Sequence, residues 1–164
     1  MCRDLSNSIP NLIRINRGKM SLDQLTEKAL ELDANRVILV DRWNMGTGKI
    51  SLYIIDSSEL TIFPPELFLS KIRLKRNFEN KIKDHVSFIT IEPNSIDEIE
   101  KLAQSFSEFF GLPIIKINEV HNRQLSSMHI IYKSKRSVQI KFIFLQRMIE
   151  IGPRITVSNQ IWDA

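Results

Sequence analysis

The chain of 164 residues is 43% hydrophobic and 26% charged, a balance typical of a folded globular domain and not of a disordered chain. Lysine and arginine number 23 against 19 acidic residues, so the net charge of +4 is too modest to indicate a partner by itself. No apolar run approaches the roughly 20 residues of a membrane helix, the N-terminus has no signal-peptide pattern, and Cys2 has no second cysteine to pair with. We therefore expect a cytoplasmic protein without a membrane partner.

The first part of the chain predicts a strand, a helix and two more strands. A short strand is expected over residues 11–15. Ser21 and Gln24 then have the spacing of a capping box, in which each side chain satisfies a backbone donor of the other residue at a helix start. Apolar residues at helical spacing follow, and further strands are expected at residues 36–40 and 50–55.

The second part of the chain repeats this order. Residues 95–103 align without gaps on residues 21–29, and Ser95 and Glu98 repeat the capping-box spacing. The strands expected around this second helix cover residues 86–91, 113–117, 128–132 and 138–145, with a turn at residues 134–137. We therefore predict an α/β fold made by internal duplication of two βαββ-like halves. A chance likeness between two amphipathic helices is the alternative.

The joint between the halves has its own pattern. The sequence FPPE at residues 63–66 is expected to interrupt the strands. Residues 67–76 then indicate an extended strand that bridges the halves, with Lys71, Arg73 and Lys75 on one face. The expected limits are residues 1–66 and 84–164 for the two halves of a single domain, and residues 67–83 for the basic link between them.

The sequence offers little catalytic chemistry. Residues 46–49, GTGK, share letters with a phosphate-binding Walker loop, but Trp43 stands where the first glycine belongs and Ile50 where the serine or threonine belongs. A polar hairpin turn is the better interpretation. The three histidines and Cys2 do not have the spacing of a zinc site, and there is no GxSxG nucleophile elbow. We expect no metal, no cofactor and no catalytic residue.

Basic residues gather in two places. Arg14, Arg17 and Lys19 surround Gly18 just before the first capped helix, where a glycine and free helix N–H groups can approach a phosphate, although Asp23 opposes an anion. The second place, between Val120 and Ile149, has no acidic residue and contains Arg123, Lys133, Lys135, Arg136, Lys141 and Arg147. This polarity fits an anionic partner. Charged strand edges that discourage aggregation are the alternative interpretation.

Four short segments, three near the N-terminus and one near the C-terminus, resemble segments of a known protein family. Residues 2–5 (CRDL), 8–11 (SIPN), 16–19 (NRGK) and 150–155 (EIGPRI) resemble, in this order, the Brix domain of ribosome-biogenesis proteins, particularly the small archaeal single-domain members. The match covers nearly the whole chain. It implies one Brix domain over residues 1–164, with each half like the anticodon-binding domain of class II aminoacyl-tRNA synthetases, and a role in ribosomal RNA processing and small-subunit assembly.

The start of the chain departs from that family pattern. Family members usually carry a further strand and an arginine- and serine-rich loop before the CRDL helix, whereas this sequence starts at that helix. We therefore expect one bare edge on the sheet of the first half, and less basic surface.

These observations together predict a non-catalytic factor that binds precursor ribosomal RNA, mainly through its phosphates. The candidate RNA-binding residues are Arg14, Arg17 and Lys19 in the first half, and Lys133, Lys135, Arg136, Lys141 and Arg154 in the second. An adaptor that docks ribosomal or ribonucleoprotein components with little direct RNA contact is the alternative. An enzyme acting on RNA is a weaker third possibility.

Overall fold

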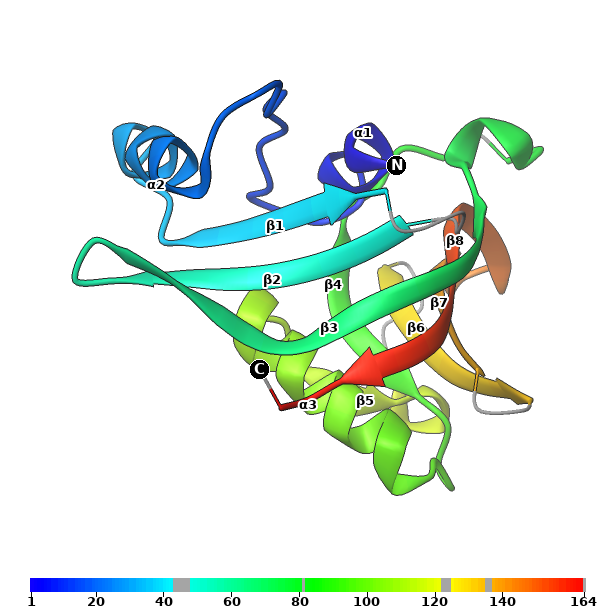
Figure 1. Ribbon diagram of the computed structural model, residues 1–164. Coiled ribbons are helices and arrows are strands. Elements are labelled where there is room, and N and C mark those ends of the chain that lie inside the picture. Colours follow the sequence, from blue (N-terminus) through cyan, green and yellow to red (C-terminus); the bar gives the residue numbers. More distant parts are fainter. Residues whose placement is uncertain (43–47, 81, 122–124, 135–136, 164) are drawn as a thin grey trace.

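The computed structural model describes residues 1–42, 48–80, 82–121, 125–134 and 137–163, and these form a single eight-stranded sheet with helices on both faces (Figure 1). The strand order is β1-β2-β3-β8-β7-β6-β4-β5. The strands are β1 Arg36–Asp41, β2 Gly48–Asp56, β3 Glu59–Arg73, β4 Val86–Ile91, β5 Ile114–Lys116, β6 Ser126–Ser134, β7 Ser137–Phe144 and β8 Ile149–Ile161. The helices are α1 Cys2–Ser6, α2 Leu22–Glu31 and α3 Asp97–Phe110, with short 3-10 turns η1 Lys75–Asn77 and η2 Ile117–Glu119.

Most of the predicted strands are confirmed, because β1, β2, β4, β5, β6 and β7 coincide with the expected segments in whole or in large part. The strand predicted at residues 11–15 is wrong. Asn11 lies in a turn and the segment from Leu12 to Arg17 has no regular secondary structure. Strand propensity needs a neighbouring strand to supply the hydrogen-bonded ladder, and no such pairing reaches this segment in the described chain.

The two predicted helix starts differ. At α2 the capping box is confirmed, since the Ser21 hydroxyl accepts from the Gln24 N–H at 3.2 Å and the Gln24 side chain accepts from the Ser21 N–H at 3.0 Å. At α3 the prediction is wrong. Ile96 is the N-cap, without a side-chain cap, and the Ser95 hydroxyl donates backwards to the Glu92 carbonyl at 2.9 Å. The turn before α3 therefore uses the hydroxyl that the capping box needs.

Strand β3 joins the halves and is longer than predicted. It has 15 residues and pairs with β2 on one side and β8 on the other. The expected break at residues 63–66 does not end the strand. Ile50 pairs with Leu67 and Leu52 pairs with Phe63, so the intervening residues form a bulge opposite Ser51. The boundary expected near residue 66 thus falls inside a continuous strand, and residues 67–73 belong to the sheet.

Strand β8 is not among the strands predicted from the sequence, where the pair Gly152-Pro153 is typical of a turn or a bulge. It is a 13-residue strand that inserts between β3 and β7. The ladder with β7 shifts register between Lys141 and Ile143, and this irregularity accommodates the Gly-Pro pair inside the strand. The insertion of β8 is what makes one sheet from the two halves.

The two faces of the sheet carry different helices. The face that carries α3 is called the inner face; there Leu102 and Phe106 of α3 join Ile89 and Met128 in the main hydrophobic core. The opposite, outer face carries α2 over β1 and β2, where Leu25 packs on Leu39 and Tyr53. In Figure 1, α2 and α3 accordingly lie on opposite sides of the β1–β2–β3 ribbon.

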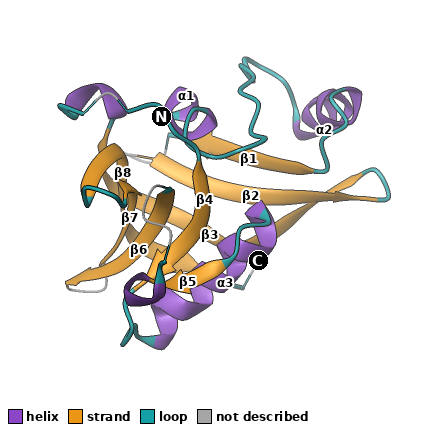
Figure 2. Cartoon of the chain, turned by 180° about the vertical axis from the view of Figure 1, so that it is seen from behind, coloured by secondary structure: helices purple, strands orange, loops and turns teal. Residues whose placement is uncertain are grey.

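The strand orders of the two halves do not show the predicted duplication. In the C-terminal half, β4 lies between β5 and β6 and is parallel to both (Figure 2). In the N-terminal half, β1 pairs directly with β2 in antiparallel sense and forms the end of the described sheet. The general α/β class is as predicted, whereas the duplication and the synthetase-like halves stay predictions.

Candidate nucleic-acid interface

A row of basic side chains crosses four neighbouring strands on the outer face. Arg73 of β3 stands opposite Arg154 of β8, Arg154 opposite Lys141 of β7, and Lys141 opposite His129 of β6. Directly opposed residues point to the same face, with Cβ atoms about 5 Å apart. Lys71, two residues before Arg73, shares this face. We call Lys71, Arg73, Lys141 and Arg154 the basic row.

The alternation of strand residues explains why the basic row faces outward. The next row across the same strands pairs Ile72, Ile155, Ile140, Ile130 and Ile91, which belong to or pack against the inner core. Side chains alternate between faces along a strand, so fixing the isoleucines inward directs their neighbours outward. The hydrophobic core thereby positions the charges of the basic row.

Arg154, a predicted RNA-binding residue, is held by an acidic neighbour. Its guanidinium donates to Glu150 through Nε, at 2.6 Å, and through Nη2. The hydrogen bond to Glu150 is the main reason that the pKa of Arg154 is raised. Glu150 offsets much of the charge, so Arg154 contributes less free positive potential than an unpaired arginine.

The Gly-Pro-Arg segment also shapes the end of the basic row. Gly152 has φ +69°, and a Cβ there would lie only 2.6 Å from Cδ2 of Phe78. Arg73 stacks over the same ring with its Cζ atom 4.3 Å from the ring centre, and Arg154 lies 5.8 Å away. Both arginines thus combine a basic head group with a packing role against Phe78.

His129 extends the basic row and was not predicted to belong to a site. Its Nδ1 lies 3.0 Å from the Thr90 hydroxyl and its Nε2 lies 3.3 Å from a Glu92 carboxylate oxygen. The pKa of His129 is lowered, first by burial and further by Lys141, while Glu92 opposes the shift. The predicted turn at residues 134–137 could not have placed His129 beside Lys141, because the register of β6 and β7 shifts by one residue between Tyr132 and Ser134.

The other basic residues predicted in the second half are Lys133, Lys135 and Arg136. Lys133 is exposed near the end of β6, while Lys135 and Arg136 fall outside the described residues. Lys71, Lys133 and Lys141 form no ion pair within the described part of the chain. Their ammonium groups are therefore available to an anion.

The basic residues predicted in the first half lie beside β1, at the other end of the sheet. Arg14 is exposed and donates to the Asn16 side chain at 2.8 Å. Arg17 lies 3.5 Å from Asp41 and donates to the Met20 carbonyl, whereas Lys19 is exposed. The structure does not bring this group into contact with the basic row, because β2 lies between β1 and β3, the first strand of the row.

Lys75 does not share the face of Lys71 and Arg73, which corrects the sequence prediction. The strand ends at Arg73, and Lys75 begins the 3-10 turn η1. Its Nζ atom is buried without a hydrogen-bond partner, and burial lowers the pKa of Lys75. Its backbone N–H donates to Asp4 at 2.7 Å. Lys75 is therefore a structural residue and not part of the basic row.

Across the described ranges, no three metal-ligating side chains gather as they would around an ion. In the same residues, no helix has the length and apolar character to cross a membrane.

Comparison with known proteins supports the fold. No protein-family model matches the sequence, and no curated protein matches it. Among solved structures, the chain is similar to a probable ribosomal biogenesis protein from Aeropyrum pernix K1, with a TM-score of 0.74 and 19% identity over 94% of this chain and 84% of that chain. It is also similar to Mil, an archaeal Imp4-like protein, with a TM-score of 0.56 and 12% identity over 91% of this chain and 81% of that chain. The chain thus shares its fold with proteins of this general kind.

Proposed function

We propose that this protein is a non-catalytic RNA-binding factor in ribosome biogenesis, acting in the processing of precursor ribosomal RNA and in small-subunit assembly. The observation that carries the proposal is the basic row, which sets cationic side chains on adjacent strands of the outer face. The likeness of the fold to a probable ribosomal biogenesis protein and to an Imp4-like protein supports the biological setting.

The geometry of the basic row suits phosphate binding better than base reading. Lys71 and Lys141 end in mobile ammonium groups, which neutralise phosphates without selecting a base. Phe78, the ring on which Arg73 and Arg154 pack, is buried at 6% exposure and packed against Gly152. It therefore offers no free face for a base to stack on. Selectivity is expected to come from RNA shape or from unpaired loops.

The test replaces lysines of the interface and leaves the arginines that pack on Phe78 in place. A triple variant, Lys71→Gln, Lys133→Gln and Lys141→Gln, removes three positive charges from the outer face and the turn beside it. Its affinity is measured for a short RNA hairpin with an unpaired loop, over a range of salt concentrations. Since each lost phosphate contact reduces the slope of log affinity against log salt by about 0.7 to 0.9, the slope is expected to shrink by about 2 to 3.

The matched control removes the same charge elsewhere. Lys28 pairs with Glu31, Lys116 pairs with Glu100, and Lys101 stacks on Trp162. Changing these three lysines to glutamine is expected to leave most of the affinity and slope intact. Equal losses in both triple variants would mean that only net charge matters and that the basic row is not the interface. RNA binding that is absent or independent of salt in the unmodified protein would favour the adaptor alternative.

A further inference from the structure

One aromatic side chain of the described structure is exposed, and it lies in the hairpin of β6 and β7. Tyr132, near the end of β6, is 45% exposed. All other aromatic side chains of the described residues are buried or half-buried. Tyrosines are enriched at binding interfaces, because one side chain offers both an apolar ring and a polar hydroxyl. Tyr132 is therefore a candidate contact residue.

The strand pairing explains why Tyr132 is exposed. It stands opposite Val138, a residue of the main core, so both side chains point to the inner face. Ile130, two residues earlier on that face, is completely buried. The partner of Ile130 is Ile91, the last residue of β4, so from residue 131 onward the described part of β6 pairs only with β7. This end of β6 lies at the margin of the molecule in both views (Figures 1 and 2). The ring thus lies where the cover of the inner face ends.

The charges around Tyr132 suit an anionic partner. Lys133, the next residue, is exposed. Lys141 of the basic row stands opposite His129, three residues before Tyr132 on β6. At about 3.3 Å per residue, this puts the ring about 10 Å along the hairpin from Lys141. The sequence has no acidic residue between Val120 and Ile149. The hairpin itself therefore attracts anions, although Glu92 beside His129 offsets part of the charge.

An exposed aromatic ring close to lysines is the combination that binds single-stranded nucleic acid. The ring stacks on a base, and the ammonium groups neutralise the phosphates next to it. In a continuous duplex the neighbouring base pairs occupy both faces of each base, so an unpaired base is the one that can reach an exposed ring. The 10 Å between Tyr132 and Lys141 corresponds to about three nucleotides, at about 3.4 Å per nucleotide of a stacked strand.

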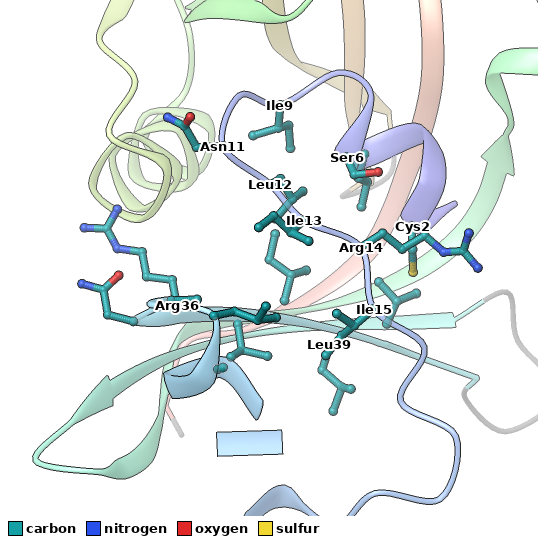
Figure 3. Close-up of a pocket in the computed structure, with 18 of the residues that line it drawn as sticks. Cys2, Ser6, Ile9, Asn11, Leu12, Ile13, Arg14, Ile15, Arg36 and Leu39 are labelled. Atoms are coloured by element: carbon teal, nitrogen blue, oxygen red, sulfur yellow. The ribbon is translucent and has the colours of Figure 1, made fainter. Parts of the chain in front are cut away.

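The cavity of about 440 Å³ beside β1 is not part of this hairpin surface. Figure 3 shows Leu12, Ile13 and Ile15 along one wall of the cavity and Leu39 on β1. Four strands separate β1 from β6 in the sheet. A base bound in that cavity would therefore not reach Tyr132. A base held beside Lys133 has the exposed ring as its aromatic contact.

We propose that Tyr132 stacks on an unpaired base of the bound RNA, while Lys133 and Lys141 bind phosphates close to that base. This inference rests on the proposed function and adds the class of ligand, which is an RNA with unpaired bases, such as a hairpin loop. Stacking involves no charge on the protein, so it contributes affinity without adding to the salt dependence, whereas the lysines supply the salt-dependent part. The two contributions can therefore be measured separately.

Three substitutions at Tyr132 distinguish stacking from other roles. Tyr132→Ala removes the ring, Tyr132→Leu keeps apolar bulk without an aromatic face, and Tyr132→Phe keeps the ring without the hydroxyl. Their affinity for a short RNA hairpin with an unpaired loop is measured by fluorescence anisotropy over a range of salt concentrations, after circular dichroism has confirmed the fold. We expect the alanine and leucine variants to bind about fivefold more weakly or worse, with an unchanged slope of log affinity against log salt. The phenylalanine variant should bind as the unmodified protein does.

Two further RNAs keep the phosphates and remove the base that stacks. One is the same hairpin with abasic nucleotides in its loop, and the other is a continuous duplex with the same number of phosphates. The unmodified protein should bind the abasic hairpin about fivefold more weakly or worse than the normal hairpin. Tyr132→Ala should lower the affinity for neither of these RNAs. The matched protein control is Met148→Ala, which removes a 53% exposed side chain beside Arg147 in the turn after β7, and it should bind the normal hairpin as the unmodified protein does.

Several outcomes would overturn the inference. Unchanged affinity of Tyr132→Ala for the normal hairpin would show that the ring contacts no base, and would favour a partner protein as its contact. Full binding by Tyr132→Leu would indicate an apolar contact without stacking. Equal losses for all three RNAs would make Tyr132 a structural residue.

The lysine variant of the proposed function separates the two ideas. If the triple lysine variant loses affinity and salt slope while Tyr132→Ala keeps both, the proposed function stands and the stacking contact is wrong. If the unmodified protein binds none of the three RNAs, both are wrong.

Discussion

Two segments near opposite ends of the sheet contain similar residues and have different structures. Residues 11–15 (NLIRI) and residues 86–91 (VSFITI) are both rich in β-branched side chains, yet only the second forms a strand. Strand β4 has a neighbour on each side, and Ile89 is completely buried. The first segment faces β1 across a cavity, and its Ile13 is 66% exposed. Pairing and burial, more than composition, decide which of the two becomes a strand.

The largest expected difference between the two segments is the loss of unfolding free energy when an isoleucine is replaced by alanine. Ile89→Ala leaves a hole beside α3 at a fully buried position, and should lower the free energy of unfolding by about 2 to 5 kcal/mol. Ile13→Ala removes a largely exposed side chain, and should change it by about 0.5 kcal/mol or less. Urea unfolding followed by circular dichroism measures both values. Equal costs would show that the segment before α2 is packed as firmly as β4.

A smaller difference is expected between the two helix starts. Ser21→Ala removes a hydroxyl that accepts a hydrogen bond from the first turn of α2 and breaks the reciprocal pair with Gln24. The expected cost is about 1 kcal/mol of unfolding free energy. Ser95→Ala removes only a bond to the preceding turn at an exposed residue, so a change of about 0.5 kcal/mol or less is expected. If Ser95→Ala were the costlier change, Ser95 would be the true cap of α3.

The same comparison explains how much of the fold the sequence could predict. Local patterns located six strands and the cores of the two longer helices, because burial on one face leaves a periodic signal. The patterns failed where distant pairing decides the outcome. The sequence FPPE in β3 looks like a break, and Gly152-Pro153 in β8 looks like a turn, but both lie inside strands whose partners absorb the irregularity as bulges. No local signal reveals those partners.

The candidate site was predictable only in part, for a related reason. Lys141 and Arg154 were expected to bind RNA, but their alignment with Arg73 and His129 depends on β8 lying between β3 and β7. The ion pair of Arg154 with Glu150, four residues earlier, also needs the bulge around Gly152. Charge counting along the chain finds basic segments, whereas the strand register determines which charges meet and which are neutralised.

The smallest effect concerns His129, the buried end of the row on the outer face. Burial lowers its pKa in the folded protein below the usual value near 6.5, and Lys141 adds to the shift. The unfolded chain therefore binds a proton at this side chain more readily than the folded chain does. It follows that the free energy of unfolding should fall modestly as the pH drops below about 6.5, and that the contribution of His129 should be fully present above that pH.

Urea unfolding between about pH 7.5 and about pH 5.5 measures this slope of the unfolding free energy against pH. His129→Asn should flatten it, because the variant has no imidazole to protonate. The exposed His85 provides the control, and His85→Gln should retain the slope of the unmodified protein. A slope that survives in His129→Asn would assign the pH dependence to other groups, and His129 would then not be the residue whose burial opposes protonation.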